Sequence, residues 1–161
     1  MSDLKVAVAG AGGRMGGANI RAIAATPGLV LQSAFDRSGA PVIGRDAGEL
    51  AGLDALGVTI TDNLDTALAG AEAIIDFTAP ANSVLLAREA ARRGLVHIVG
   101  TTGCSEADEA AIAQAAADGA RIVKAGNFSL GVNLLLGLVR QAAAALPGFD
   151  IEILEMHHNK K

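Results

Sequence analysis

Tryptophan and tyrosine are absent from this sequence, cysteine occurs once, and only 19% of the 161 residues are charged. A single cysteine excludes a disulfide-linked scaffold and fits the reducing cytoplasm. The formal net charge of −4 argues against a dedicated nucleic-acid binder, which normally presents a basic surface. No stretch approaches the roughly 18 uninterrupted apolar residues of a membrane-spanning helix, and the first residues lack a signal-peptide pattern. We therefore expect a cytoplasmic protein that binds neither nucleic acid nor a membrane.

Small and apolar residues dominate the rest of the chain. Hydrophobic residues account for 51% of it, which excludes intrinsic disorder, and 161 residues suffice for one sizeable core. There are 34 alanines and 20 glycines. Small side chains let backbones approach each other closely, as in helices packed on a parallel sheet.

Apolar runs alternate with stretches of helical periodicity. Strands are predicted at residues 4–9, 29–35, 73–77, 96–99, 120–124 and 151–158, with a weak one at 58–61. Helices are predicted at residues 15–26, 63–69, 82–93, 105–119 and 130–146, and Ser105 with Asp108 has the spacing of a capping box. Residues 37–56 have no clean period and indicate a long loop, in which a helical turn is an open alternative. This alternation predicts the α/β class, with a Rossmann-type parallel sheet covered by helices on both faces.

A glycine-rich turn follows the first predicted strand and opens the first helix. Gly10, Gly13 and Gly16 fit the spacing G-x-x-G-x-x-G. The stricter spacing G-x-G-x-x-G fails, because Met15 occupies its last position. Glycines at such a turn let the pyrophosphate of a dinucleotide approach the helix N-terminus.

An acidic residue stands at the end of the second predicted strand, about 20 residues beyond the turn. Asp36 can accept hydrogen bonds from ribose hydroxyls, and the neighbouring Arg37 can pair with a 2′-phosphate. The combination favours a dinucleotide site over a glycine turn without a ligand. Asp36 favours NAD, and Arg37 leaves NADP open.

Two further turns follow strand ends, which is where ligands lie in open α/β sheets. The first is Asp76-Phe77-Thr78-Ala79-Pro80, for which an ordinary strand-to-helix turn is an equal alternative. The second is Gly100-Thr101-Thr102-Gly103, whose polar groups can either face a nicotinamide carboxamide or cap a loop. Cys104 follows it, and an inert buried thiol is favoured over a nucleophile because His97 alone is near in sequence.

The last residues are Glu155-Met156-His157-His158-Asn159-Lys160-Lys161. On a strand, Glu155 and His157 share one face and His158 points to the other. Histidine and lysine there can transfer a proton or hold a carboxylate. From these residues alone, a solvated terminus or a tag remnant is the favoured alternative. No third cluster of ligands is visible, so no metal site is predicted.

Taken together, the motifs resemble the N-terminal part of the dihydrodipicolinate reductase family, also called 4-hydroxy-tetrahydrodipicolinate reductase. Five motifs occur in the family's order over the whole chain: residues 8–16, Asp76-Phe77-Thr78 with Pro80, Gly100-Thr101-Thr102-Gly103, Gly126-Asn127-Phe128-Ser129 leading to Gly131-Val132-Asn133, and Glu155-Met156-His157-His158 with Lys161. The resemblance implies NADH- or NADPH-dependent reduction of 4-hydroxy-tetrahydrodipicolinate to tetrahydrodipicolinate, on the diaminopimelate route to lysine.

The resemblance also implies a role for each matched residue. His157 and Lys161 would be the catalytic proton-transfer pair, and His158 would contact a substrate carboxylate. Asp36 and Arg37 would meet the adenosine ribose. The other cofactor-binding residues would be Gly10, Ala11, Gly12, Gly13, Arg14, Met15, Gly100, Thr101, Thr102, Ala125, Gly126, Asn127 and Phe128. A small dicarboxylate substrate and a homo-oligomer, a tetramer in the family, are implied as well.

The family pattern extends beyond the last residue of this chain. It continues with Asp-Ala-Pro-Ser-Gly-Thr, which holds a substrate carboxylate, whereas this sequence stops at Lys161. We therefore expect a fragment, with a dinucleotide-binding domain at residues 1–126 and the start of an α+β substrate-binding and oligomerisation domain at residues 127–161. Two other functions stay open, a non-catalytic NAD(P)-binding module and a related dehydrogenase that acts on an amino-acid-like substrate.

Overall fold

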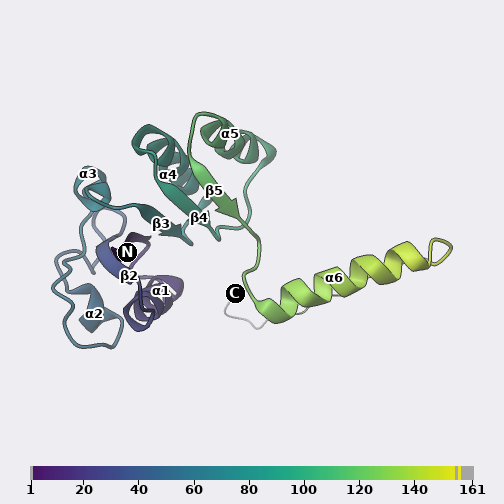
Figure 1. Cartoon of the computed structure of the whole chain (residues 1–161), viewed down its shortest axis with the longest axis horizontal. Helices are drawn as coiled ribbons and strands as arrows, with labels where there is room; N and C mark the ends of the chain where they lie inside the picture. Colours follow the sequence, from purple (N-terminus) through teal and green to yellow (C-terminus); the bar gives the residue numbers. More distant parts are fainter. Residues whose placement is uncertain (1, 155, 157–161) are drawn as a thin grey trace. The chain divides into compact units, whose positions relative to one another are not determined.

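The computed structural model describes residues 2–154 and 156. The strands within these residues are β1 (Leu4–Ala9), β2 (Leu29–Phe35), β3 (Ala73–Asp76), β4 (Val96–Val99) and β5 (Arg121–Lys124). The helices are α1 (Arg14–Ala25), α2 (Ala47–Leu50), α3 (Leu64–Leu68), α4 (Pro80–Arg93), α5 (Glu106–Ala117) and α6 (Leu130–Ala145) (Figure 1).

All of these strands belong to one parallel sheet, in the order β2-β1-β3-β4-β5. At least one helix separates each strand from the next along the chain (Figure 1). The predicted Rossmann-type parallel sheet is therefore confirmed. The ranges predicted for β1, β2 and β4 are correct to the residue. Each strand is short and mostly apolar, and a glycine lies directly next to at least one of its ends.

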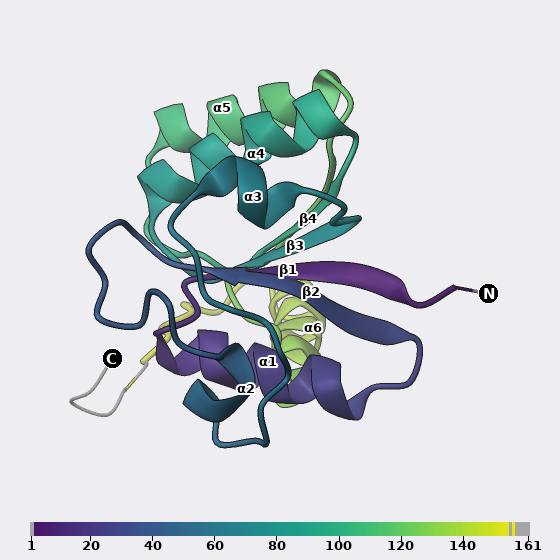
Figure 2. The same ribbon diagram turned by 90° about the vertical axis from the view of Figure 1, so that its left-hand side faces the viewer.

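Helices cover both faces of the sheet. α1 and α2 lie on one face, and α3, α4 and α5 lie on the other (Figure 2). Val6 and Val8 of β1 pack with Ile20 of α1, whereas Ala7 of the same strand packs with Leu86 of α4. Successive strand residues point to opposite faces, so burial on both faces explains why β1 is apolar without polar alternation.

Helix ends follow local capping chemistry. Ser105 caps α5, and Asp108 completes the predicted capping box. α4 begins at Pro80, two residues before the predicted start at Asn82. Proline suits the first turn of a helix, because the N–H that it lacks would have no intrahelical partner there. Gly94 ends α4 with φ of 69°, a left-handed conformation that favours glycine.

The region from residue 37 to residue 61 is irregular, apart from the short helix α2. The weak strand predicted at residues 58–61 is wrong, because this segment makes only isolated bridges, from Thr59 to Asp46 and from Thr61 to Phe35. Asp46 organises the loop instead. Its carboxylate accepts hydrogen bonds from the backbone N–H groups of Gly48, Glu49, Leu56 and Val58. These bonds, led by the one from Leu56, hold the pKa of Asp46 below its usual value of 3.8.

The chain divides into two compact units, Met1–Gly126 and Asn127–Lys161. In the second unit, α6 has no buried residue. The strand predicted at residues 151–158 is wrong for its described residues, since 151–154 have no regular structure. A strand needs a neighbour for its backbone hydrogen bonds, and the described part of this unit contains no other strand. No described helix has the length and apolar character to span a membrane.

Candidate functional site

The sheet brings the ends of β1 and β3 together. Ala9 and Asp76, the last residues of these strands, are register partners. β2 lies on one side of β1 and β3 lies on the other. The connections therefore diverge at this point, and open α/β sheets bind ligands beyond the strand ends at such a switch point. Gly10 and the turn that begins at Phe77 follow directly.

The spacing of the glycines in the first turn has a steric cause. Gly10 has φ of 68°, which a residue with a side chain adopts at a cost. The N–H of Gly13 donates to the carbonyl of Gly10 over 2.9 Å. A Cβ atom on Gly16 would lie 2.2 Å from that same carbonyl oxygen. α1 can therefore begin directly against the turn only because residue 16 is glycine.

Asp36 is bound directly to the glycine turn. Its Oδ2 accepts a hydrogen bond from the N–H of Gly12 over 2.8 Å, and its Oδ1 accepts one from the N–H of Arg37 over 2.8 Å. A Cβ atom on Gly12 would approach this carboxylate and Val42 to 3.1 Å. The pairing of turn and acid that the sequence predicts is thus a physical contact.

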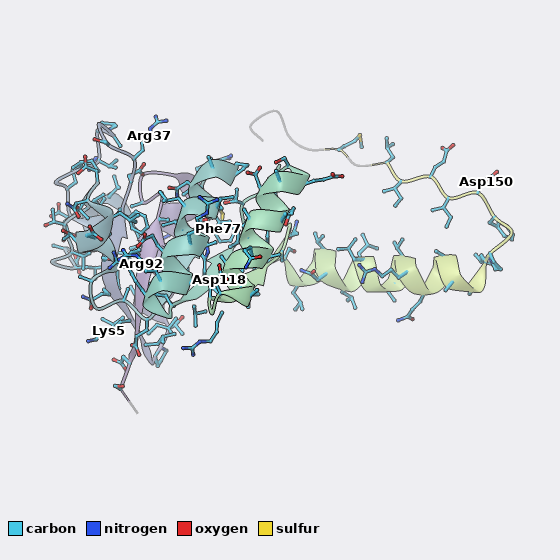
Figure 3. All side chains as sticks on the ribbon, turned by 90° about the horizontal axis from the view of Figure 1, so that it is seen from above. Lys5, Arg37, Phe77, Arg92, Asp118 and Asp150 are labelled. Atoms are coloured by element: carbon cyan, nitrogen blue, oxygen red, sulfur yellow. The ribbon has the colours of Figure 1, made fainter. Side chains whose placement is uncertain are left out.

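A cavity of about 630 Å³ opens beside this contact. That volume lies within the usual range of small-molecule sites. Arg37 is exposed at its edge and reaches outward from the loop after β2 (Figure 3). The lining residues all belong to the first unit and are Gly10, Gly12, Gly13, Phe35, Asp36, Arg37, Ser38, Ala40, Pro41, Val42, Asp62, Leu64, Phe77, Thr78, Ala79, Asn82 and Leu85.

A buried polar network lies directly behind the cavity. Asp76 and His97 are both fully buried, and Nε2 of His97 lies 3.2 Å from Oδ2 of Asp76. The hydroxyl of Ser83, also buried, donates to the same oxygen over 2.5 Å. The hydroxyl and the N–H of Thr78 donate to Oδ1 over 2.6 and 3.0 Å. Thr78 also lines the cavity, so the network fixes part of its wall.

The surroundings of Asp76 favour its ionised form. Burial raises the pKa of this carboxyl, but hydrogen bonds from His97, Ser83 and Thr78 outweigh burial, and the pKa lies below the usual 3.8. Nδ1 of His97 is buried and has no hydrogen-bond partner among the described residues. With a proton on Nε2, His97 can donate a hydrogen bond to Asp76.

The Gly-Thr-Thr-Gly turn is tied to the same network. Thr101 is buried, and its Oγ1 accepts from the N–H of Thr78 over 3.1 Å and lies 2.8 Å from Oγ of Ser83. Its hydroxyl therefore points into the network, whereas the sequence left open whether it faces a ligand. Gly100 is required, because a Cβ atom there would lie 2.0 Å from the ring of Phe77.

The predicted cofactor-binding residues fall into three groups. Those that line the cavity are Gly10, Gly12, Gly13, Asp36 and Arg37. Those of the first unit outside its lining are Ala11, Arg14, Met15, Gly100, Thr101, Thr102, Ala125 and Gly126. Asn127 and Phe128 belong to the second unit. All of these cofactor contacts stay predictions.

The three residues predicted to act on the substrate are His157, His158 and Lys161, and they lie outside the described residues. Cys104 is half-buried and packs against the apolar cluster of Ala87, Ile112 and Ala115. That environment gives the nucleophile alternative no support. No group of three potential metal ligands occurs within the described part of the chain.

Sequence reasoning missed Ser38 and Asp62, which meet at the edge of the cavity. The hydroxyl of Ser38 donates to Oδ2 of Asp62 over 2.8 Å. Both residues stand in irregular segments without periodicity, so only the turn chemistry of these segments could have drawn attention to them.

Comparison with known proteins agrees with this geometry. The sequence model described as "Dihydrodipicolinate reductase, N-terminus" matches residues 4–128, and the one described as "Dihydrodipicolinate reductase, C-terminus" matches residues 131–161. The chain belongs to the dihydrodipicolinate reductase family. The resemblance drawn from the five motifs is therefore confirmed.

Named members of the dihydrodipicolinate reductase family are close in sequence. The chain is 54% identical to 4-hydroxy-tetrahydrodipicolinate reductase of Sinorhizobium medicae and 56% identical to that of Rhizobium meliloti, over 99% of its own length in both cases. It spans 59% of the length of each of these relatives.

Solved structures share the fold. A dipicolinate-bound dihydrodipicolinate reductase from Paenisporosarcina sp. TG-14 superposes with a TM-score of 0.76 at 23% identity, over 99% of this chain and 60% of that one. GenD2 from gentamicin A biosynthesis, in complex with NAD, gives a TM-score of 0.60 at 28% identity, over 80% of this chain and 36% of that one.

Proposed function

We propose that this chain is the cofactor-binding part of a 4-hydroxy-tetrahydrodipicolinate reductase, and that the cavity of its first unit takes NADH or NADPH. The observation that carries the proposal is the hydrogen bond from the N–H of Gly12 to Asp36 at the cavity wall. Family membership and the 4-hydroxy-tetrahydrodipicolinate reductase names of its relatives support it.

The residues around the cavity fit a dinucleotide. Gly13 is the N-cap of α1 and brings no side-chain oxygen to the helix end, and the first turn contains no acidic residue. The positive end of the helix dipole is thus available to a diphosphate. The carboxylate of Asp36, held by two backbone donors, has lone pairs left for ribose hydroxyls. Apolar side chains of Val42, Leu64 and Leu85 offer a surface for the adenine ring.

The proposed reaction needs a hydride donor, a proton donor and a group that holds the substrate. The net reaction adds a hydride and a proton to the substrate and releases its 4-hydroxyl group as water. A reduced nicotinamide, when bound, would supply the hydride. His157 or Lys161 then donates the proton that completes the reduction, and His158 holds a substrate carboxylate. We expect His157→Gln in the full-length protein to lower turnover with little change in cofactor affinity, because the proton donor acts after the cofactor has bound. Unchanged turnover would remove His157 from this role.

The substrate is proposed to be a small dicarboxylate. One fold neighbour is described as dipicolinate-bound, and dipicolinate is a planar dicarboxylate. We further propose that the complete protein is a homo-oligomer of the cytoplasm, in line with the family resemblance and the single cysteine.

The first test is a titration of the chain with NADH, followed by nicotinamide fluorescence and repeated with pyridine-2,6-dicarboxylate. The absence of tryptophan and tyrosine keeps the protein's own signal low. We expect saturable NADH binding that Asp36→Ala weakens and Asp54→Ala, at an exposed position outside the cavity lining, leaves unchanged. A chain that is folded by circular dichroism and binds no NADH would contradict the proposal.

Two alternatives make different predictions in the same assay. A non-catalytic NAD(P)-binding module binds NADH but shows no response to the dicarboxylate. The NAD in the structure of GenD2, which shares 28% identity over 80% of this chain, supports dinucleotide binding under either alternative. A related dehydrogenase would respond to an amino-acid-like ligand instead of the dicarboxylate.

A further inference from the structure

Asp62 stands beside the end of β2, although 26 residues separate it from Asp36 in sequence. The N–H of Asp36 donates to the carbonyl of Thr61, and the N–H of Thr61 donates to the carbonyl of Ala34, both over 3.1 Å. These two bonds hold the segment before α3 against the strand end. Asp62 therefore enters the cavity lining next to the acid that is expected to hold the ribose.

The charged residues that line the cavity are Asp36, Arg37 and Asp62. The cavity lining thus contains two carboxylates and one guanidinium. Oδ2 of Asp62 accepts a hydrogen bond from the hydroxyl of Ser38 over 2.8 Å. Ser38 follows Arg37 directly, so its hydroxyl would otherwise be a natural partner for an anionic group on the ribose.

From this arrangement we infer that Asp62 is a specificity-determining residue that selects NADH against NADPH. The inference rests on the proposed function, because it requires the cavity to be the cofactor site. The 2′-phosphate of NADPH carries a charge between −1 and −2 near neutral pH. At the edge of the cavity, this phosphate would meet the carboxylate of Asp62 in addition to that of Asp36. The hydroxyl of Ser38 already donates its hydrogen bond to Asp62. Arg37, which is exposed and reaches outward, offsets this repulsion only in part.

The test compares the dissociation constants of NADH and NADPH for the parent chain and for Asp62→Asn. An amide at this position keeps the size of the side chain and an acceptor for Ser38, but it removes the charge. We expect the ratio of the NADPH constant to the NADH constant to fall about tenfold. The difference in this ratio between the parent chain and Asp62→Asn should shrink at high ionic strength, because salt screens exposed charges.

Two matched variants isolate the charge of Asp62. Asp54→Asn removes an exposed carboxylate outside the cavity lining and should leave the ratio unchanged. Ser38→Ala removes the hydroxyl but keeps the carboxylate, so it should not improve NADPH binding. All three side chains are exposed, so circular dichroism should show the parent fold in each variant.

The outcomes separate the two proposals. If NADH binds saturably but Asp62→Asn leaves the ratio unchanged, or Asp54→Asn lowers it equally, the inference is overturned and the proposed function stands. If a folded parent chain binds neither dinucleotide, the proposed function falls, and the inference falls with it.

Discussion

His97 and Asp76 form a fully buried pair, with Nε2 of the imidazole 3.2 Å from Oδ2 of the carboxylate. The pair joins Asp76, the last residue of β3, to the second residue of the neighbouring strand β4. Asp76 also accepts a hydrogen bond from the hydroxyl of Thr78. The methyl group of Thr78 lies against the glycine turn, because a Cβ atom on Gly10 would be 2.9 Å from that methyl carbon. One carboxylate therefore connects the turns after β1, β3 and β4.

We predict that Asp76→Asn destabilises the fold by about 3–5 kcal/mol. The amide keeps only one of the two oxygens and carries no charge, so His97 and Ser83, which both bond Oδ2, lose hydrogen bonds to a charged acceptor that are worth about 1.5–3 kcal/mol each. Denaturant unfolding at pH 7 measures this loss. Ser83→Ala removes one donor and should cost less, about 1–3 kcal/mol.

Because of the same pair, the free energy of unfolding should decrease as the pH falls. The pKa of Asp76 is lowered in the folded chain from its usual 3.8. Its stabilisation is therefore complete above pH 3.8 and is lost as the pH falls through the folded pKa. The gap in unfolding free energy between the parent and Asp76→Asn should narrow below about pH 4. A gap that stays constant down to pH 3 would show that the ionised carboxylate is not the stabilising form.

Gly16 and Gly17 allow a matched test of the glycine turn. A Cβ atom at Gly16 would lie 2.2 Å from the carbonyl oxygen of Gly10, whereas one at Gly17 would meet nothing closer than 3.5 Å. We predict that Gly16→Ala displaces α1 from the turn, costs about 1–3 kcal/mol and weakens NADH binding more than tenfold. Gly17→Ala should instead stabilise the chain by roughly 0.5–1 kcal/mol and keep NADH binding.

Denaturant unfolding and the NADH titration measure both variants side by side. Equal effects of the two substitutions on NADH binding would mean that the turn does not determine the cofactor site.

Sequence reasoning succeeded where one local rule decides the structure. β1 ends in the apolar run Val6-Ala7-Val8-Ala9, which stops before Gly10, and Ser105 with Asp108 caps α5 as predicted. It failed for residues 151–154, the described part of the strand predicted at 151–158, because strand formation depends on a partner strand rather than on alternation alone. It also missed Asp62, because the backbone contacts that bring it to the end of β2 come from segments without periodicity.

The orientation of Thr101 shows a second limit. Side-chain alternation holds within a strand, and Thr101 lies two residues after β4. Its burial in the Asp76 network follows from Ser83 on α4, a residue that belongs to none of the predicted motifs. The buried half of the site therefore depends on three elements at once, and no single motif contains it.

Arg37 should affect the two cofactors unequally. Its backbone N–H is bound to Asp36, while its exposed side chain reaches the edge of the cavity. We predict that Arg37→Ala weakens NADPH binding more than NADH binding, because only NADPH carries a 2′-phosphate. The fluorescence titration with both cofactors measures this, and equal weakening would remove the guanidinium from the phosphate position.

The isolated chain should associate through α6. Leu130, Leu134 and Leu138 follow one another at intervals of four residues, so they share one face of the helix. They are 86%, 64% and 53% exposed. Contiguous apolar surface of this kind favours contact with another apolar surface. Sedimentation over a range of concentrations should therefore show a rising average mass.

Two variants identify the surface responsible. The double substitution Leu134→Gln and Leu138→Gln should lower the association constant, because glutamine keeps helix propensity but removes apolar area. Arg140→Gln, an exposed polar change on the same helix, should leave it nearly unchanged. A parent chain that stays monomeric at the highest concentration would show that the exposed leucines do not drive self-association.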